Sequence, residues 1–113
     1  MDVVQDLRLA RVALAARLRE TAAQEYVVET VKAAAEARVV QDAGGEKGLG
    51  ENEAARKRAL TAKVAENPMF TKAQQDLWDE QYQAKLAQVE VDARQDELKV
   101  LVAAMKRDGE EMQ

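Results

Sequence analysis

Residues 70–105 read FTKAQQDLWDEQYQAKLAQVEVDARQDELKVLVAAM, and every seventh residue of this segment is apolar. The apolar positions are Phe70, Leu77, Ala84, Val91, Leu98 and Met105. An apolar residue that recurs every seven positions over many turns is typical of an α-helix that buries one seam along a partner helix. The segment therefore predicts a long, coiled-coil-like helix packed lengthwise against another helix.

A glutamine follows each of the first four apolar positions at a distance of four residues. These glutamines are Gln74, Gln81, Gln88 and Gln95. Buried in the seam, they would fix the register of the two helices by hydrogen bonding, as a core Asn does. At the edge of the seam, they would be uncharged helix formers partly in water. We favour the edge, because burying four amides is unfavourable unless each one is fully hydrogen-bonded.

No glycine or proline precedes Gly44, so we expect a first long helix over about residues 2–42, capped by Asp2. Its apolar line is Leu7, Ala10, Leu14, Leu18, Thr21, Val28, Val31, Ala35 and Val39. Four of the five glycines lie in residues 43–51, which predicts a loop. A short helix is expected over about residues 52–66, with Asn52 as its cap.

Asn67-Pro68 interrupts the helical pattern, because proline lacks an N–H group and disfavours helical angles in the residue before it. Thr71-Lys72-Ala73-Gln74 fits a capping box, so the third helix is expected over about residues 71–107, ending near Gly109. Two separate helices and one rod kinked at the proline both fit this pattern. The prediction is one all-α domain, residues 1–113, built as an antiparallel hairpin of two long helices with a short middle helix.

Composition argues against an enzyme. The chain has no histidine and no cysteine, which removes the commonest general base, the commonest transition-metal ligand and all thiolate chemistry. We therefore expect no catalytic residues, no cofactor and no metal site. No apolar stretch approaches the roughly 20 residues of a membrane span. A cytoplasmic protein without a membrane partner is expected.

A second apolar line runs along residues 70–105, about 200° around the helix from the first at 100° per residue. A helix that is apolar on two opposed faces must be covered on both. We expect one face to pack on the first helix and the other to be covered by the short second helix, a second copy or another protein. The expected partner-binding residues are Trp78, Tyr82, Leu86 and Val89. The alternative for Trp78 and Tyr82 is that they only pack the end of the helix.

A basic group lies on the expected short helix. It consists of Arg56, Lys57, Arg58 and Lys63. Four cations beside a loop are possible contacts for the phosphates of a nucleic acid. Against that stand Glu51, Glu53 and Glu66 nearby, a net charge of −4 and the lack of interleaved aromatic residues. A solvated charged face is the favoured interpretation, and nucleic-acid binding is disfavoured.

Three short runs resemble a class of small uncharacterised coiled-coil proteins encoded by tailed phages and prophages. They are Gly50-Glu51-Asn52-Glu53-Ala54-Ala55-Arg56, Asn67-Pro68-Met69-Phe70 and Asp92-Ala93-Arg94. In that class a Gly-x-Asn-Glu-x-x-Arg segment precedes an Asn-Pro-x-aromatic break and a long helix. The resemblance covers residues 50–105 and carries over no functional residue. It implies an accessory role in recombination or replication, in the cytoplasm of the host.

The function expected from the sequence is a non-enzymatic protein–protein interaction module that acts as a homo-oligomer. It would be a phage-encoded accessory or host-inhibitory protein, with a host or phage protein as a further partner. The alternative is a nucleic-acid-binding accessory factor that uses the basic short helix.

Overall fold

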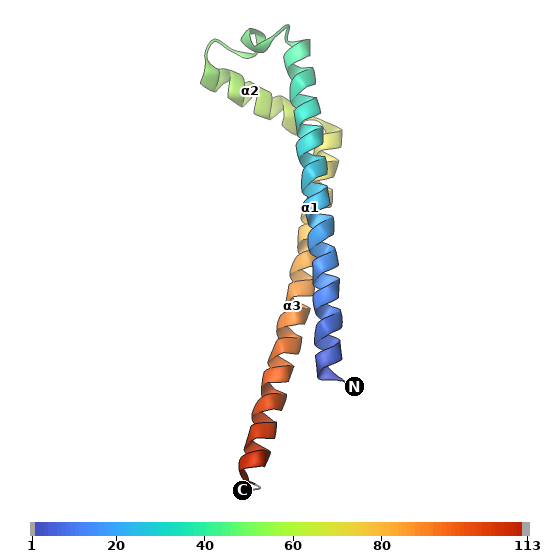
Figure 1. Cartoon of the computed structure of the whole chain (residues 1–113). Helices are drawn as coiled ribbons and strands as arrows, with labels where there is room; N and C mark the ends of the chain where they lie inside the picture. The colour runs from blue at the N-terminus through green and yellow to red at the C-terminus, as the bar shows by residue number, and fades with distance from the viewer. Residues whose placement is uncertain (1, 112–113) are drawn as a thin grey trace. The chain divides into compact units, whose positions relative to one another are not determined.

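The computed structural model describes residues 2–111, and every regular element in that range is helical (Figure 1). Helix α1 spans Val3–Asp42, the 3-10 helix η1 spans Glu46–Leu49, α2 spans Glu53–Ala65 and α3 spans Pro68–Glu111. Parts of α1 pack antiparallel against parts of α3, and α2 is the short helix between them in the chain. The predicted fold class, an all-α antiparallel hairpin of two long helices with a short middle helix, is confirmed.

The chain divides into two compact units. The terminal unit combines the chain up to Glu20 with the chain from Gln81 onward, and the central unit is Thr21–Glu80. Both long helices contribute to both units, so each unit contains its own seam between α1 and α3.

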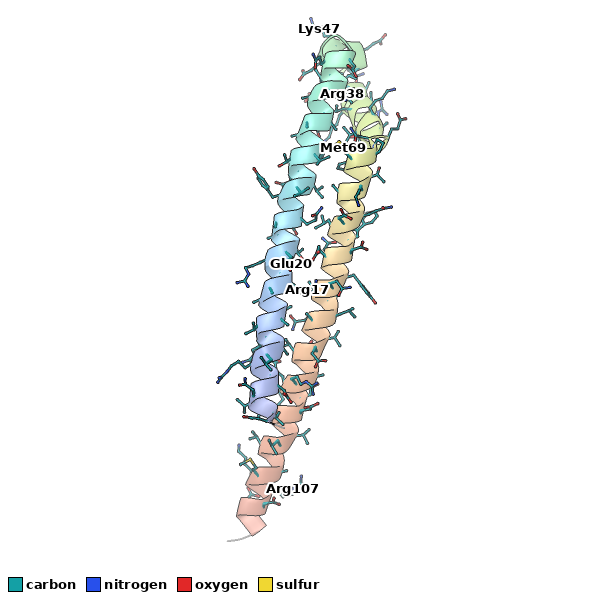
Figure 2. The ribbon with its side chains drawn as sticks, turned by 90° about the vertical axis from the view of Figure 1, so that its right-hand side faces the viewer. Arg17, Glu20, Arg38, Lys47, Met69 and Arg107 are labelled. Carbon is teal, nitrogen blue, oxygen red and sulfur yellow. The ribbon has the colours of Figure 1, made fainter. Side chains whose placement is uncertain are left out.

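In the terminal unit, the first half of α1 lies beside the second half of α3 (Figure 2). Leu7 and Ala10 from α1 and Val91 from α3 form the buried core, and Leu14 and Leu98 pack against it. This arrangement confirms that the seven-residue repeat of α3 forms a seam. An apolar seam of this kind is stabilised mainly by the removal of its side chains from water.

The seam of α1 differs from the predicted apolar line at one residue. Leu18 was expected in the line but is 54% exposed. The buried positions of α1 follow a seven-residue repeat, in which Leu7 and Thr21 are buried and Leu14 is half-buried. Leu18 comes four residues after Leu14 and therefore lies at the edge of the seam, at the place that the glutamines occupy on α3.

The seam of the central unit is partly polar. Val28 of α1 and Ala73 and Leu77 of α3 form a buried apolar cluster, and Val31 and Phe70 pack against them. A side-chain amide joins the two helices as well. The Nε2 atom of Gln24 donates a hydrogen bond of 3.1 Å to the backbone carbonyl oxygen of Ala73. Since residue 24 supplies no apolar side chain, this hydrogen bond takes the place of an apolar contact.

Two helix starts follow the sequence prediction. The Asp2 carboxylate accepts a hydrogen bond from the Val4 N–H at 3.0 Å. The Asn52 side chain accepts one from the Ala55 N–H at 2.8 Å. Each side chain satisfies an N–H group that has no partner within the first turn of its helix, so both caps are confirmed.

The end of α1 is a glycine stop, as the sequence predicts. Gly44 and Gly45 have φ angles of 77° and 118°, which favour glycine over residues with a Cβ atom. The Gly45 N–H donates to the carbonyl oxygen of Val40 at 2.9 Å, and the Gly44 N–H to that of Gln41 at 3.1 Å. These hydrogen bonds satisfy the last carbonyl groups of the helix and release the chain into the loop that contains η1.

The predicted start of α3 at Thr71 is wrong. The helix begins at Pro68, and Asn67 is the capping residue, because its side-chain oxygen accepts hydrogen bonds from the N–H groups of Met69 at 2.9 Å and Phe70 at 3.3 Å. Proline is well tolerated at a first helical position, where its missing N–H would have no partner anyway. Thr71 lies inside the helix and donates back to the Asn67 carbonyl oxygen at 3.1 Å. A break at residues 66–67 thus separates α2 from α3, and the two are distinct helices.

Candidate interaction surface

The face of α3 opposite the seam is apolar and exposed. In the terminal unit, Ala84 and Val91 are buried on the seam side. On the other side Tyr82 is 59% exposed, Leu86 is 46% exposed and Val89 is 63% exposed. We call Tyr82, Leu86 and Val89 the outer stripe. Their spacing of four and then three residues places them on one face of the helix.

The sequence predicted these three residues, together with Trp78, as partner-binding residues. Trp78 lies on α3 within the central unit and is 59% exposed. Neither Trp78 nor Tyr82 packs a helix end, because both lie in the interior of α3 and both are open to water. Their exposure leaves two large aromatic surfaces available to a partner.

Some of the polar groups near the outer stripe are paired within α3. Arg94 forms ion pairs with Glu90 at 2.8 Å and with Glu97 at 3.0 Å. Hydrogen bonds with Glu97 and Glu90 raise the pKa of Arg94 above its ordinary value. The Gln88 amide likewise donates to an Asp92 carboxylate oxygen at 3.0 Å. These contacts pair some of the charged groups on this side of α3, where Lys85 and Asp96 also lie exposed.

The glutamines lie at the edge of the seam. Gln81 and Gln88 are exposed, and Gln74 and Gln95 are half-buried. None of the four is therefore a core residue, as the edge interpretation expected. The seam continues instead through the positions three residues after each apolar rung, where Ala73 is buried and Ala87 is half-buried.

The four cations of the basic group do not form one face. All lie on α2, but at 100° per residue Arg58 is about 200° around the helix from Arg56. Arg56 is half-buried, and its Nε atom donates a hydrogen bond of 3.0 Å to the Gly50 carbonyl oxygen. Lys57 shares an open hollow with the acidic residues Glu46 and Glu53. Arg56 therefore binds the loop through Gly50, and the other cations do not share a single face of α2.

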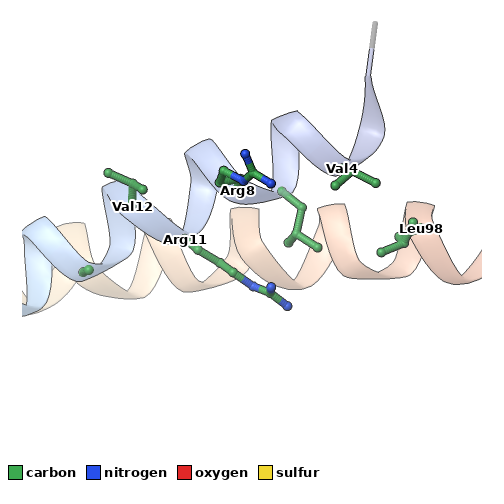
Figure 3. A pocket seen from close by; sticks show the side chains of 7 residues that line it. Val4, Arg8, Arg11, Val12 and Leu98 are labelled. Carbon is green, nitrogen blue, oxygen red and sulfur yellow. The ribbon is translucent and has the colours of Figure 1, made fainter.

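A shallow hollow in the terminal unit lies where α1 begins (Figure 3). Val4 and Leu98 are part of its lining, and Arg8 and Arg11 of α1 stand at its sides. Leu98 is the last apolar rung of α3 that packs on the core of this unit. The hollow runs along the first turns of α1, from Val4 to Ala15, and Leu98 is its lining residue from α3.

Met105 was expected to be a seam residue, but it is 64% exposed. It is the rung after Leu98, and α1 begins at Val3, so no part of α1 lies opposite it (Figure 2). The sequence repeat correctly identified Met105 as an apolar residue on the seam face of α3. It did not reveal that the partner helix ends one rung earlier.

Among residues 2–111, no group of three or more His, Cys, Asp or Glu side chains is placed to hold a metal ion. Over the same range no helix combines the length and the apolar character needed to cross a membrane. No protein-family model matches the chain, and neither the curated proteins nor the solved structures with which it was compared give a match.

Proposed function

We propose that the protein is a non-enzymatic interaction module that associates with copies of itself through the outer stripe. The observation that carries this proposal is the exposure of Tyr82, Leu86 and Val89 on the face of α3 opposite a formed seam. Complete burial of one such side chain contributes about 1.5–3 kcal/mol relative to full exposure. Three neighbouring side chains therefore provide a substantial driving force for association.

A second copy is a suitable partner because helix–helix contact is the packing mode that this chain already uses. The outer side of α1 also carries exposed apolar residues, Leu9 and Val12, but Gln5 and Arg19 lie on either side of them along the same face. The outer stripe has three exposed apolar residues, one of them the aromatic Tyr82, and the charged residue next along its face is Asp96, seven residues after Val89. Aromatic residues are enriched at the contacts that contribute most to protein–protein binding.

The resemblance of residues 50–105 to small tailed-phage and prophage proteins supports a more specific role. In this proposal the protein is a phage-encoded accessory or host-inhibitory protein that acts in the host cytoplasm, with a host or phage protein as a further partner. Trp78 is an exposed aromatic residue of the central unit that is available for such a contact.

The experiment is a comparison of solution mass by light scattering for two double variants. Leu86→Asp with Val89→Asp places two charges on the outer stripe and should lower the mass of the assembly. Leu9→Asp with Val12→Asp is the matched control, since it makes the same exchange at a similarly exposed leucine and valine on α1. The control should keep the mass of the unmodified protein. An unchanged mass in the outer-stripe variant, with helical content retained in circular dichroism, would refute the proposal.

A further inference from the structure

The hollow beside the first turns of α1 meets a second hollow on α3. Residues of α1 from Val4 to Ala15 line the first hollow together with Leu98 of α3 (Figure 3). The second hollow runs from Leu98 to Lys106, so the two meet at Leu98. At 1.5 Å per residue, they follow about 16 Å of α1 and about 12 Å of α3. Both belong to the terminal unit, and we call them together the basic groove.

Cations line the basic groove, and none of the described residues in either lining is acidic. Arg8 and Arg11 come from α1, and Lys99 and Lys106 come from α3. All four residues are exposed, and none of them forms an ion pair within residues 2–111. The whole chain has 21 acidic and 17 basic residues, so four basic side chains and no acidic one depart from its composition. The groove therefore carries a local positive charge.

Acidic residues of the terminal unit gather on the other side of its seam. At 100° per residue, Asp6 lies about 140° around α1 from Arg11, and Glu97 lies about 180° around α3 from Lys106. Two carboxylates of α3 are on the same side of the helix as the groove but outside both linings, namely Asp92 and Glu110. The positive charge of the groove is thus a local feature of a chain whose net charge is −4.

The floor of the basic groove is apolar. Leu98 is half-buried, Val4 is 51% exposed and Val102 is 42% exposed. Apolar side chains beside cations fit a ligand that presents apolar and anionic groups together. A phosphate backbone has no such apolar groups, and none of the described lining residues is an aromatic that could stack on a base. A lipid bilayer meets a protruding face of a protein, whereas these side chains line a hollow.

We propose that the basic groove binds an acidic amphipathic helix of a partner protein. A helix laid lengthwise in the groove places its apolar side chains on Leu98 and its carboxylates beside the cations. Lys99 and Lys106 are seven residues apart, so carboxylates two turns apart on the partner helix match both. Lys106 lies about 160° around α3 from Leu86 of the outer stripe. The groove is therefore a separate surface, and this proposal does not rest on self-association.

Fluorescence anisotropy with a labelled synthetic peptide tests the proposal. The probe is a helix-forming peptide with leucines along one face and glutamates beside them, and the reference peptide has lysine at every glutamate position. The glutamate peptide should bind saturably, and its affinity should fall as salt rises, because salt screens exposed charge pairs. The lysine peptide should not bind. Absence of saturable binding by the glutamate peptide, or equal binding of the two peptides, would overturn the proposal.

Charge reversal locates the contact. Arg8→Glu with Arg11→Glu should weaken binding of the glutamate peptide on the order of tenfold, since two attractive pairs become repulsive. Lys57→Glu with Arg58→Glu is the matched control, because it makes the same change in net charge at exposed residues of α2. The control should bind the peptide as the unmodified protein does. An equal loss in both variants would show a response to net charge alone and overturn the proposal.

Two further variants make the result independent of one substitution and of the proposed function. Lys99→Glu with Lys106→Glu reverses the charges that α3 contributes and should also weaken binding, with helical content checked by circular dichroism. Leu86→Asp with Val89→Asp should leave the peptide affinity unchanged, whatever its effect on the solution mass. A loss of affinity in this outer-stripe variant as large as in the groove variants would assign the peptide to the outer stripe and overturn the proposal.

Vesicles of phosphatidylserine and phosphatidylcholine, and a DNA duplex, test the other classes of anionic partner. Neither should bind the unmodified protein. Binding of either one that Arg8→Glu with Arg11→Glu abolishes would assign the groove to a lipid surface or to nucleic acid, and would overturn the proposal of an acidic helix.

Discussion

The hydroxyl of Thr21 donates a hydrogen bond to the backbone carbonyl oxygen of Glu80, with 3.4 Å between Oγ1 and O. This contact ties α1 to α3 in the central unit through the backbone of Glu80 and leaves its side chain unused. One carboxylate oxygen of Glu80 is buried and has no hydrogen-bond partner among the described residues. Glu80 is half-buried at a position three residues after the Leu77 rung, and the same position of the two adjacent repeats is alanine, Ala73 and Ala87.

Replacing Glu80 by leucine should stabilise the fold. The substitution removes a buried polar group without a partner, adds apolar surface to the seam, and keeps the Thr21 hydrogen bond because that bond uses the backbone. We expect the free energy of unfolding to rise by about 1–3 kcal/mol. Urea denaturation at one fixed protein concentration measures this change.

The control is Asp79→Leu, since Asp79 is the exposed acidic neighbour. Its effect should stay within about 0.5 kcal/mol. A Glu80→Leu variant that is no more stable than the Asp79→Leu variant would show that the buried Glu80 carboxylate does not lower the free energy of unfolding.

Asn67→Ala should weaken the start of α3. The Asn67 side chain satisfies the N–H groups of Met69 and Phe70, and its loss should lower the free energy of unfolding by about 1 kcal/mol. Thr71→Ala is the matched control, because the sequence alone assigned the cap to Thr71. Its cost should be the smaller of the two in thermal or urea unfolding. A larger loss of stability in Thr71→Ala than in Asn67→Ala would indicate that Thr71 caps α3.

The basic group should not support binding of nucleic acid. Arg56 is engaged with Gly50, and Arg58 points from another side of α2, so the four cations cannot follow one phosphate backbone. We expect no band shift with single- or double-stranded DNA at low salt. A shift that weakens steeply as salt rises, and that Lys57→Ala with Arg58→Ala removes, would contradict this expectation.

Much of the fold was predictable because apolar residues recur at regular intervals along the long helices. The seven-residue repeat through Leu77, Ala84 and Val91 identified the buried side of α3, and the glycines identified the end of α1. The start of α3 was harder to predict than the other helix starts, since Asn67 and Thr71 are both plausible caps and the fit of proline at a first helical position decided between them. Leu18 was wrongly assigned to the seam because it lies four residues after Leu14, at the edge of the buried repeat. Met105 was wrongly assigned because a repeat records apolar character and not the extent of the partner helix.

The candidate surface was predictable in part. The position of Leu86, about 200° around the helix from Ala84, is enough to place the two residues on opposite faces of α3. The same wheel geometry would have separated Arg56 from Arg58 before the structure was known. The partner was not predictable, because an exposed apolar face determines that contact with water is unfavourable but not which surface replaces the water.

Sedimentation equilibrium of the unmodified protein at micromolar concentration tests the central claim most directly. One chain has a mass of 12.5 kDa. Self-association predicts a mass that is a multiple of this value and that falls as the protein is diluted. A folded protein with the mass of one chain at every concentration would contradict the account, because Tyr82, Leu86 and Val89 would then remain in water.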